Sequence, residues 1–146
     1  MDNTQTYQKV ASYEGKAGEI KHVLLLYSGG LDTSVMLKWI QDEYGAKVTT
    51  LTLDLGQQHD DLEAIKQKAL KFGAVKAVAL DVREEFAAEY LAKGIKANAH
   101  YQGEYHLSTP MARALLAKKA VEVAEAEGAD CIAHGSTGKG NDQVRI

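Results

Sequence analysis

Residues 28–34, Ser-Gly-Gly-Leu-Asp-Thr-Ser, combine residue types that bind phosphate. They directly follow the apolar run at residues 23–27, so a buried strand is expected to end in a glycine turn that opens a helix. Glycines let the backbone approach an anion, hydroxyl groups donate hydrogen bonds, and a helix start adds unpaired N–H groups with partial positive charge. The segment therefore predicts a nucleotide-binding loop. The alternative is a glycine turn with a serine cap.

A second glycine-rich loop, residues 134–142, follows a strand-like run near the end of the chain. Its backbone N–H groups and Lys139 suit a phosphate, while Thr137 and Asn141 offer neutral hydrogen-bonding groups. Asp142 can pair with an ammonium group. This mixture could hold a zwitterionic amino acid beside ATP. The alternative is a solvated loop that ends in a charged turn.

The elements that must position these loops follow from hydrophobic periodicity. It predicts strands over 22–27, 47–53, 75–80 and 130–133, and helices over 31–44, 61–72, 83–95 and 110–127. Gly45 and Gly73 stand where helix C-caps belong, and Thr109 is expected as an N-cap with Pro110 in the first helical position.

The helical spacing also predicts which side chains face the core. Leu31, Val35 and Trp39 share one face of the first helix, and this face is expected to pack against the sheet. The corresponding residues of the second helix are Leu62, Ile65, Ala69 and Phe72.

Strands that alternate with helices indicate an α/β fold, doubly wound, with a mostly parallel sheet and helices on both faces. Ligands of such sheets bind outside the carboxyl ends of the strands, where the strand order reverses. The loops at those ends are residues 28–34, 54–57 and 134–142. If the first and last strands are neighbours, two glycine-rich loops flank one crevice.

Length and composition favour one folded domain, because the 146 residues are 45% apolar and 25% charged. We expect residues 1–20 to be a flexible extension and residues 21–146 to form the domain. A net charge of −3 offers no basic surface for nucleic acid, and no apolar stretch approaches the roughly 20 residues that span a membrane, so a cytoplasmic protein is expected. Cys131, the single cysteine, is expected as a small buried side chain rather than a nucleophile.

Four motifs, two of which contain the glycine-rich loops above, together resemble the N-terminal, ATP-binding pyrophosphate-loop part of the argininosuccinate synthase family. They are residues 28–34, Asp-Leu-Gly-Gln at 54–57, the helix at 63–70, and above all the string at 134–145. GMP synthetase, NAD synthetase and tRNA-thiolating enzymes share the first loop but not the last string. The resemblance extends over residues 21–146 and implies an adenine nucleotide α-hydrolase-like, Rossmann-like fold.

The resemblance implies a ligase that joins citrulline to aspartate with release of AMP and pyrophosphate, using ATP and Mg²⁺. No residue is expected to act by covalent chemistry, and no side-chain metal site is expected. The residues implied for ATP are Leu26, Tyr27, Ser28, Gly29, Gly30, Leu31, Asp32, Thr33, Ser34, Leu53, Ala133, His134, Gly135, Ser136, Thr137, Gly138, Lys139, Gly140 and Asn141.

The same resemblance assigns the amino-acid substrates. Thr137, Asn141 and Asp142 would hold aspartate. Tyr105, Pro110, Asn141 and Arg145 would hold citrulline, with the arginine on its carboxylate.

The chain also departs from the family pattern. Leu26 and Leu53 stand where the family usually has alanine, Pro110 where many members have serine or alanine, and Ala114 where proline is usual. The family chain continues into a second domain, so the implied partner is a homo-oligomer or a complementary C-terminal chain. The alternatives are a catalytically incomplete nucleotide-binding module and another pyrophosphate-loop adenylating enzyme; the acidic balance disfavours one that acts on tRNA.

Several single residues carry weaker expectations. Asp32 and Asp54 are either helix or turn caps or contacts to magnesium or ribose, and Tyr105 without the resemblance is an exposed loop aromatic. Arg83 and Arg113 are expected as surface charges of helices. His22, His59, His100 and His106 have no spacing typical of a metal site. A valine at position 29 is expected to fill the place of the anion and to leave the fold intact.

Overall fold

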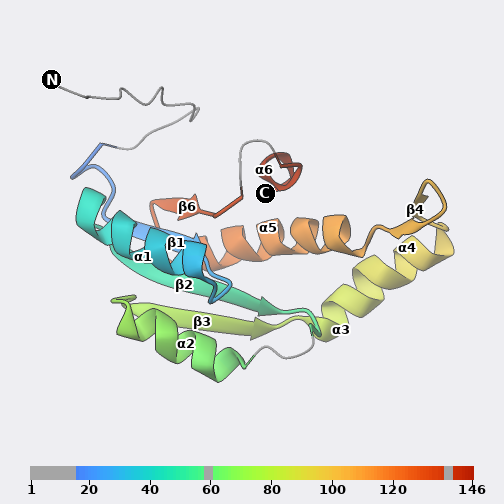
Figure 1. Cartoon of the computed structure of the whole chain (residues 1–146), viewed down its shortest axis with the longest axis horizontal. Coiled ribbons are helices and arrows are strands. Elements are labelled where there is room, and N and C mark those ends of the chain that lie inside the picture. Colours follow the sequence, from blue (N-terminus) through green and yellow to red (C-terminus); the bar gives the residue numbers. More distant parts are fainter. Residues whose placement is uncertain (1–15, 58–60, 137–139) are drawn as a thin grey trace, which may run out of the picture.

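A computed structural model describes residues 16–57, 61–136 and 140–146 of the chain. Its main sheet contains the parallel strands β1 (His22–Leu26), β2 (Lys47–Asp54), β3 (Lys76–Asp81) and β6 (Cys131–Ala133), in the order β3-β2-β1-β6 (Figure 1). The helices between them are α1 (Leu31–Tyr44), α2 (Leu62–Lys71) and α5 (Ser108–Glu127). The chain moves outward from β1 to β3 and then crosses back to β6, so the order reverses between β1 and β6. The predicted parallel, doubly wound α/β fold is confirmed.

Helices cover both faces of the sheet, and neighbouring side chains of β1 point to opposite faces, so both sets are buried. Leu24 and Leu26 pack with residues of α5 on one face, while Val23 and Leu25 pack with residues of α1 and α2 on the other. Figure 1 shows α5 and α2 on opposite sides of the strands. Two apolar layers therefore hold the carboxyl ends of β1 and β2 in place.

The face of α1 that packs against the sheet is not the predicted one. Leu31, Val35 and Trp39 are 77%, 59% and 52% exposed, whereas the buried positions include Leu37 and Ile40. In α2 the prediction fares better, since Ala69 is buried, Leu62 and Ile65 are half-buried, and only Phe72 is mostly outside.

The helix caps are partly as predicted. Gly45 is the C-cap of α1 in the left-handed conformation, but Phe72 is the C-cap of α2 and Gly73 follows it with a φ of +96°. Thr109 is not an N-cap, because α5 already begins at Ser108 after Leu107 and has no side-chain cap.

The segment between β3 and α5 differs most from its prediction. The expected helix over 83–95 consists of α3 (Arg83–Glu85), a π-helical segment η1 (Phe86–Leu91) and α4 (Ala92–Lys96). A hairpin of β4 (His100–Tyr101) and β5 (Tyr105–His106) follows, and its two imidazole rings meet edge to face on the exposed surface, with ring centroids 4.8 Å apart. Gln102 and Gly103 at its tip both have positive φ, as a tight hairpin turn requires. The sequence analysis did not predict this hairpin.

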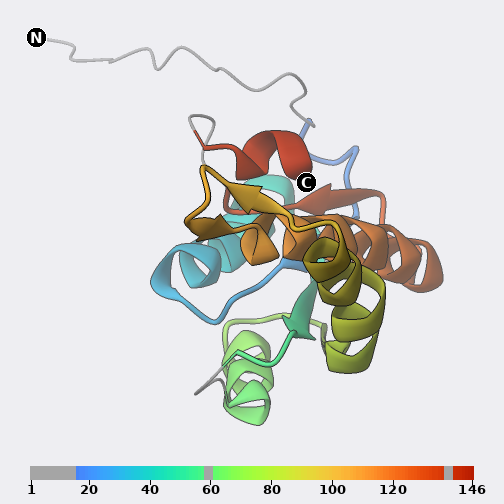
Figure 2. The ribbon, with the colours of Figure 1, turned by 90° about the vertical axis from the view of Figure 1, so that its right-hand side faces the viewer.

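The last element is the short helix α6 (Asp142–Arg145), which was also not predicted. It contacts α5 and lies above that helix in both views of the ribbon (Figures 1 and 2). Most of the predicted N-terminal extension, residues 1–15, lies outside the described residues, as does His59. Ile20, within that extension, packs against the α1–α2 side of the core. No helix in the described part of the chain is long and apolar enough to cross a membrane.

Candidate functional site

A cavity of about 710 Å³ opens at the carboxyl ends of β1 and β2, beside the point where the strand order reverses. Its walls come from both glycine-rich loops, the ends of β1 and β2, the hairpin, α5 and α6. The lining residues to which the sequence analysis gave a binding role are Leu26, Tyr27, Ser28, Asp32, Thr33, Leu53, Tyr105, His134, Gly135, Ser136, Gly140, Asn141, Asp142 and Arg145. The two loops thus share one cavity, although residues 35–133 separate them in the sequence.

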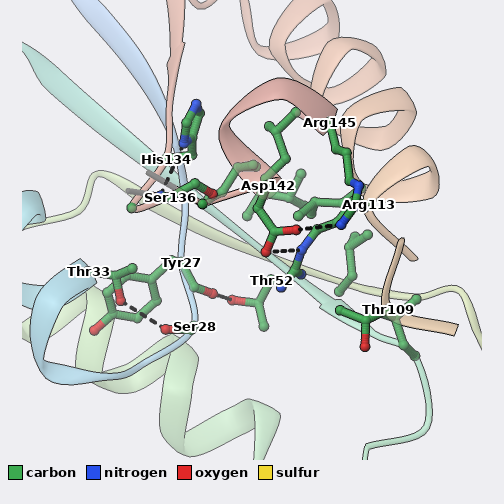
Figure 3. Close-up of a pocket in the computed structure, with 18 of the residues that line it drawn as sticks. Tyr27, Ser28, Thr33, Thr52, Thr109, Arg113, His134, Ser136, Asp142 and Arg145 are labelled. Atoms are coloured by element: carbon green, nitrogen blue, oxygen red, sulfur yellow. Dashed lines mark hydrogen bonds and ion pairs between the residues drawn. The ribbon is translucent and has the colours of Figure 1, made fainter. Parts of the chain in front are cut away.

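The first loop presents its polar groups to this cavity. Ser28 Oγ accepts a hydrogen bond from the Gly30 N–H at 3.3 Å and lies 3.2 Å from Thr33 Oγ1 (Figure 3). Helix α1 starts directly after Gly30, which supplies no side-chain cap. The N–H groups of its first turn, with the positive end of the helix dipole, are therefore available to an anion at this loop.

Ser34 has a structural role in the same loop. The residue is 4% exposed, and its hydroxyl donates to the Gly30 carbonyl at 2.7 Å, so the Tyr27 hydroxyl, 2.8 Å away, must donate to Ser34. Only two of the three hydroxyl groups of the loop line the cavity, those of Ser28 and Thr33. Four other residues that the resemblance implied for ATP also lie outside the cavity lining: Gly29, Gly30, Leu31 and Ala133.

Gly29 fits closely against α2 rather than against the cavity. Its φ is +77°, and an added Cβ would lie 2.9 Å from Ile65 Cγ1. Lys68 of α2 donates to the Gly29 carbonyl at 2.5 Å. The expectation that valine at position 29 leaves the fold intact is therefore wrong, because that side chain would collide with α2.

Buried side chains form the floor of the cavity. Leu26 and Leu53 are 7% and 5% exposed and belong to the core that α5 covers. Thr52 Oγ1 donates to the Tyr27 carbonyl at 2.7 Å and ties the end of β1 to β2. The two leucines that depart from the family pattern are accommodated within the core.

The second loop contributes from the opposite wall. The backbone N–H of Ser136 donates to His134 Nδ1 at 3.2 Å, which turns the start of this loop back on itself. Gly140 and Asn141 line the cavity further along. Thr137, Gly138 and Lys139 lie outside the described residues.

A cluster of charges occupies the end of the cavity near α6. Arg113 Nε lies 3.0 Å from Asp142 Oδ2, and Arg145 Nη1 lies 3.6 Å from Asp142 Oδ1. Arg113 was expected as a surface charge, but it is half-buried in the cavity wall. The helical spacing could have indicated this position. Thr109, Arg113 and Leu116 occupy positions i, i+4 and i+7 of α5, so they share one helix face, and all three line the cavity.

The remaining predicted residues divide between the cavity and its surroundings. Tyr105 reaches the cavity from the hairpin, and Pro110 does not line it. Asp54 accepts from the Gly56 N–H and lies 3.4 Å from Arg83, so it is engaged in its own turn. Asp32 is the carboxylate that the first loop contributes to the lining. Within residues 16–57, 61–136 and 140–146, no three His, Cys, Asp or Glu side chains converge as a metal site.

Several reactive or charged side chains in the described part of the chain lie outside the cavity. Cys131 is half-buried in β6, and this burial raises the pKa of its thiol, so the nucleophilic thiolate is disfavoured. Arg83 pairs with Asp81 at 2.6 Å and lowers the pKa of that carboxyl to about 2. His22 Nε2 lies 2.8 Å from Thr49 Oγ1.

Comparison with known proteins gives a consistent result over most of the chain. The family model "Arginosuccinate synthase N-terminal HUP domain" matches residues 22–146. Argininosuccinate synthase of Pyrococcus furiosus is 60% identical over 124 residues, which cover 85% of this chain and 30% of that protein. Argininosuccinate synthase of Thermoplasma volcanium is 58% identical over 127 residues, which cover 87% of this chain and 31% of that protein. The chain thus spans less than a third of the length of these relatives.

Solved structures share the fold at low sequence identity. NAD⁺ synthetase from Burkholderia pseudomallei superposes with a TM-score of 0.52 at 19% identity, over 78% of this chain and 45% of that one. NMN synthetase from Francisella tularensis gives 0.55 at 16% identity, over 73% and 42%.

Proposed function

This chain belongs to the argininosuccinate synthase family, whose N-terminal domain it matches, and from that premise we propose that its cavity binds ATP and both amino-acid substrates of a ligase. The reaction joins citrulline to aspartate and releases AMP and pyrophosphate. One observation carries the proposal: the serine-rich loop and the second glycine-rich loop line the same cavity at the switch point of the sheet.

The triphosphate would lie against the first loop. Ser28 and Thr33 place hydroxyl groups there, and the open start of α1 adds N–H donors. As the resemblance implies, Lys139 of the second loop would add positive charge to the phosphate site. Asp32 suits a magnesium ion bound to the phosphates, since Mg²⁺ prefers oxygen ligands and usually takes only one or two carboxylates. Bound there, the ion would offset negative charge on the phosphates.

The amino acids would occupy the charged end of the cavity. Asp142 would accept the ammonium group of aspartate, and the resemblance implies Thr137 and Asn141 as further residues that hold this substrate. Arg145 would pair with the carboxylate of citrulline, and Tyr105 and Asn141 would border that substrate. The opposite charges of Asp142 and Arg145 within one wall support this division.

Two displacement steps complete the reaction. The ureido oxygen of citrulline attacks the α-phosphorus, the bond to the β-phosphate oxygen breaks, and pyrophosphate leaves. The amine of aspartate then attacks the ureido carbon, loses a proton, and AMP leaves with the former ureido oxygen. No protein nucleophile is required, so the domain contributes alignment of the reactants and stabilisation of charge.

Citrulline-dependent exchange of labelled pyrophosphate into ATP tests this function. Exchange should require citrulline and proceed without aspartate, because only the first step is needed. It would be measured with the chain alone and with the C-terminal part of the Pyrococcus furiosus relative added. ATP binding without exchange in both samples would favour a nucleotide-binding module, and absence of ATP binding would contradict the proposal as a whole.

The variant Asp142→Asn separates the two steps. It removes the charge that would accept the ammonium group, so the aspartate concentration for half-maximal product formation should rise about tenfold or more. Pyrophosphate exchange should change less than about twofold, because that step does not use aspartate. An equal loss of both activities would contradict the role of Asp142.

A further inference from the structure

We propose that Arg113 is a positioning residue that fixes the carboxylate of Asp142 for the ammonium group of the amino-acid substrate. This inference rests on the proposed function, since it concerns the residue that would receive that substrate. No role in the site was assigned to Arg113 from the sequence.

The contact between the two side chains is direct and half-shielded from water. Arg113 Nε donates to Asp142 Oδ2 at 3.0 Å, and the side chains are 31% and 32% exposed. Figure 3 shows the Asp142 carboxylate between Arg113 and Arg145. A charged hydrogen bond in such partly dry surroundings is stronger than a surface ion pair.

The two helices that carry the pair differ in rigidity. Arg113 lies between the buried residues Ala112 and Leu115 of α5, a helix of 20 residues, so its backbone is anchored to the core. Helix α6 has four residues, and Asn141 gives it no side-chain cap. Because so short a helix has little stability of its own, its orientation depends on contacts with its neighbours. The Arg113–Asp142 bond joins α6 to the anchored helix.

The geometry at Asp142 leaves one oxygen open to exchange. Oδ2 receives the short bond from Arg113, whereas Arg145 Nη1 is 3.6 Å from Oδ1, longer than a good hydrogen bond. A carboxylate can accept several donors at once. A substrate ammonium group can therefore replace Arg145 at Oδ1 while Arg113 keeps the carboxylate in place, and Arg145 is released toward a substrate carboxylate.

The test compares Arg113→Met, Arg113→Lys, Asp142→Asn and the double variant Arg113→Met/Asp142→Asn in the protein with restored activity. Arg113→Met should raise the KM for aspartate about tenfold or more and leave citrulline-dependent pyrophosphate exchange within about twofold. Arg113→Lys should raise the KM for aspartate less than Arg113→Met does, because lysine restores the positive charge but not the planar guanidinium group. In the double variant, KM should exceed that of Asp142→Asn by less than about twofold. Lys93→Met, which removes a cation from an exposed pair with Glu89, is the control and should change neither readout.

A second readout on the 146-residue chain does not depend on activity. Amide hydrogen exchange at residues 144–146 should accelerate several-fold in Arg113→Met and in Asp142→Asn, with no further gain in the double variant. The proposal would be overturned if the two substitutions accelerated amide exchange additively in the double variant. It would also be overturned if Arg113→Met changed neither the amide exchange of residues 144–146 nor the KM for aspartate. If the unmodified protein shows no citrulline-dependent pyrophosphate exchange, the proposed function fails, and the amide measurement still decides whether Arg113 holds α6.

Discussion

At the scale of single residues, the neighbouring glycines of the first loop serve different purposes. Gly29 has a φ of +77° and leaves no room for a Cβ beside Ile65. Gly30 has a φ of −70°, which other residues adopt, and an added Cβ would lie 3.3 Å from Ser28 Oγ. Gly29 is therefore required by its backbone conformation and by its packing on α2. Gly30 is required because a larger residue would displace the Ser28 hydroxyl, which faces the cavity.

Alanine at each position should separate these roles. Gly29→Ala should lower the free energy of unfolding by about 1–2 kcal/mol, because the left-handed conformation is strained for any side chain. Gly30→Ala should change stability by less than about 0.5 kcal/mol and weaken ATP binding, because Ser28 must move. Urea unfolding and calorimetric titration with ATP would measure the two effects. A Gly29→Ala protein as stable as the parent would contradict this assignment.

Loop residues could be identified from the sequence better than helix residues. Ser28 and His134 lie within two residues of a strand end, and Asp32 lies in the first turn of the helix that follows β1; such positions meet at one edge of a parallel sheet. Ser34, which was expected at the ligand, is buried, and Arg113, which was expected on the surface, lines the cavity. On a helix, the direction of a side chain depends on how the helix is rotated against the sheet, and that rotation was not known.

At the scale of elements, the rotation of α1 follows from its first turn. Ser34 must reach both the Gly30 carbonyl and the Tyr27 hydroxyl, so this side of the helix faces the sheet. Leu37 and Ile40 then follow on the buried side, and the apolar stripe that begins at Leu31 faces outward. Hydrophobic spacing alone predicted the opposite face, because it does not register hydrogen bonds made by small polar residues.

Substitutions on the two faces of α1 should differ sharply. Leu37→Ala should lower the free energy of unfolding by about 2–5 kcal/mol, because Leu37 is fully buried. Trp39→Ser on the outer face should change it by less than about 0.5 kcal/mol. Denaturant unfolding followed by circular dichroism would compare them. Equal destabilisation by both substitutions would show that the buried face has been misplaced.

The short elements escaped prediction for a physical reason. The strands of the hairpin have two residues each and α6 has four. No hydrophobic period can be established over so few residues. Contacts with the rest of the molecule hold these elements, and Arg113 and Asp142 provide one of them.

At the scale of the whole molecule, carboxylates join parts that are far apart in the sequence. Asp130 Oδ2 accepts from the backbone N–H groups of Lys21 and His22, at 2.8 and 2.9 Å, and these bonds lower its pKa below the ordinary 3.8. Glu85 contacts Lys118 and Lys119 of α5, which lower its pKa below 4.5. One carboxylate joins β6 to the start of β1, and the other joins α3 to α5.

Acid should therefore weaken the fold through these links. Since the pKa values are lower in the folded state than in the unfolded one, their stabilisation is complete above about pH 5 and decreases as the pH falls through 4.5 and 3.8. Asp130→Asn and Glu85→Gln should lower the melting temperature at pH 7 and reduce its further decrease between pH 5 and 3. Glu125→Gln, at an exposed position of α5, is the matched control. The melting temperatures would be measured at pH 7, 5 and 3. An equal decrease of the melting temperature with pH in the parent and in all variants would contradict the prediction.

The overall architecture could be predicted because strand, helix and loop alternate along the chain in a regular pattern. Parallel strands with helical crossovers place successive loops at one edge, and the neighbours β1 and β6 bring the two glycine-rich loops together. The volume and charge of the cavity depended on side chains of α5 and α6, which local patterns do not place.

The outward position of Trp39 has a practical consequence for spectroscopy. Its indole is the only one in the sequence and lies edge-on to Tyr44, with ring centroids 5.6 Å apart. Emission from such a solvated ring should change little when the core melts, so intrinsic fluorescence is a poor monitor of denaturation here. A shift of that emission toward shorter wavelength would instead signal that another surface has covered the outer side of α1.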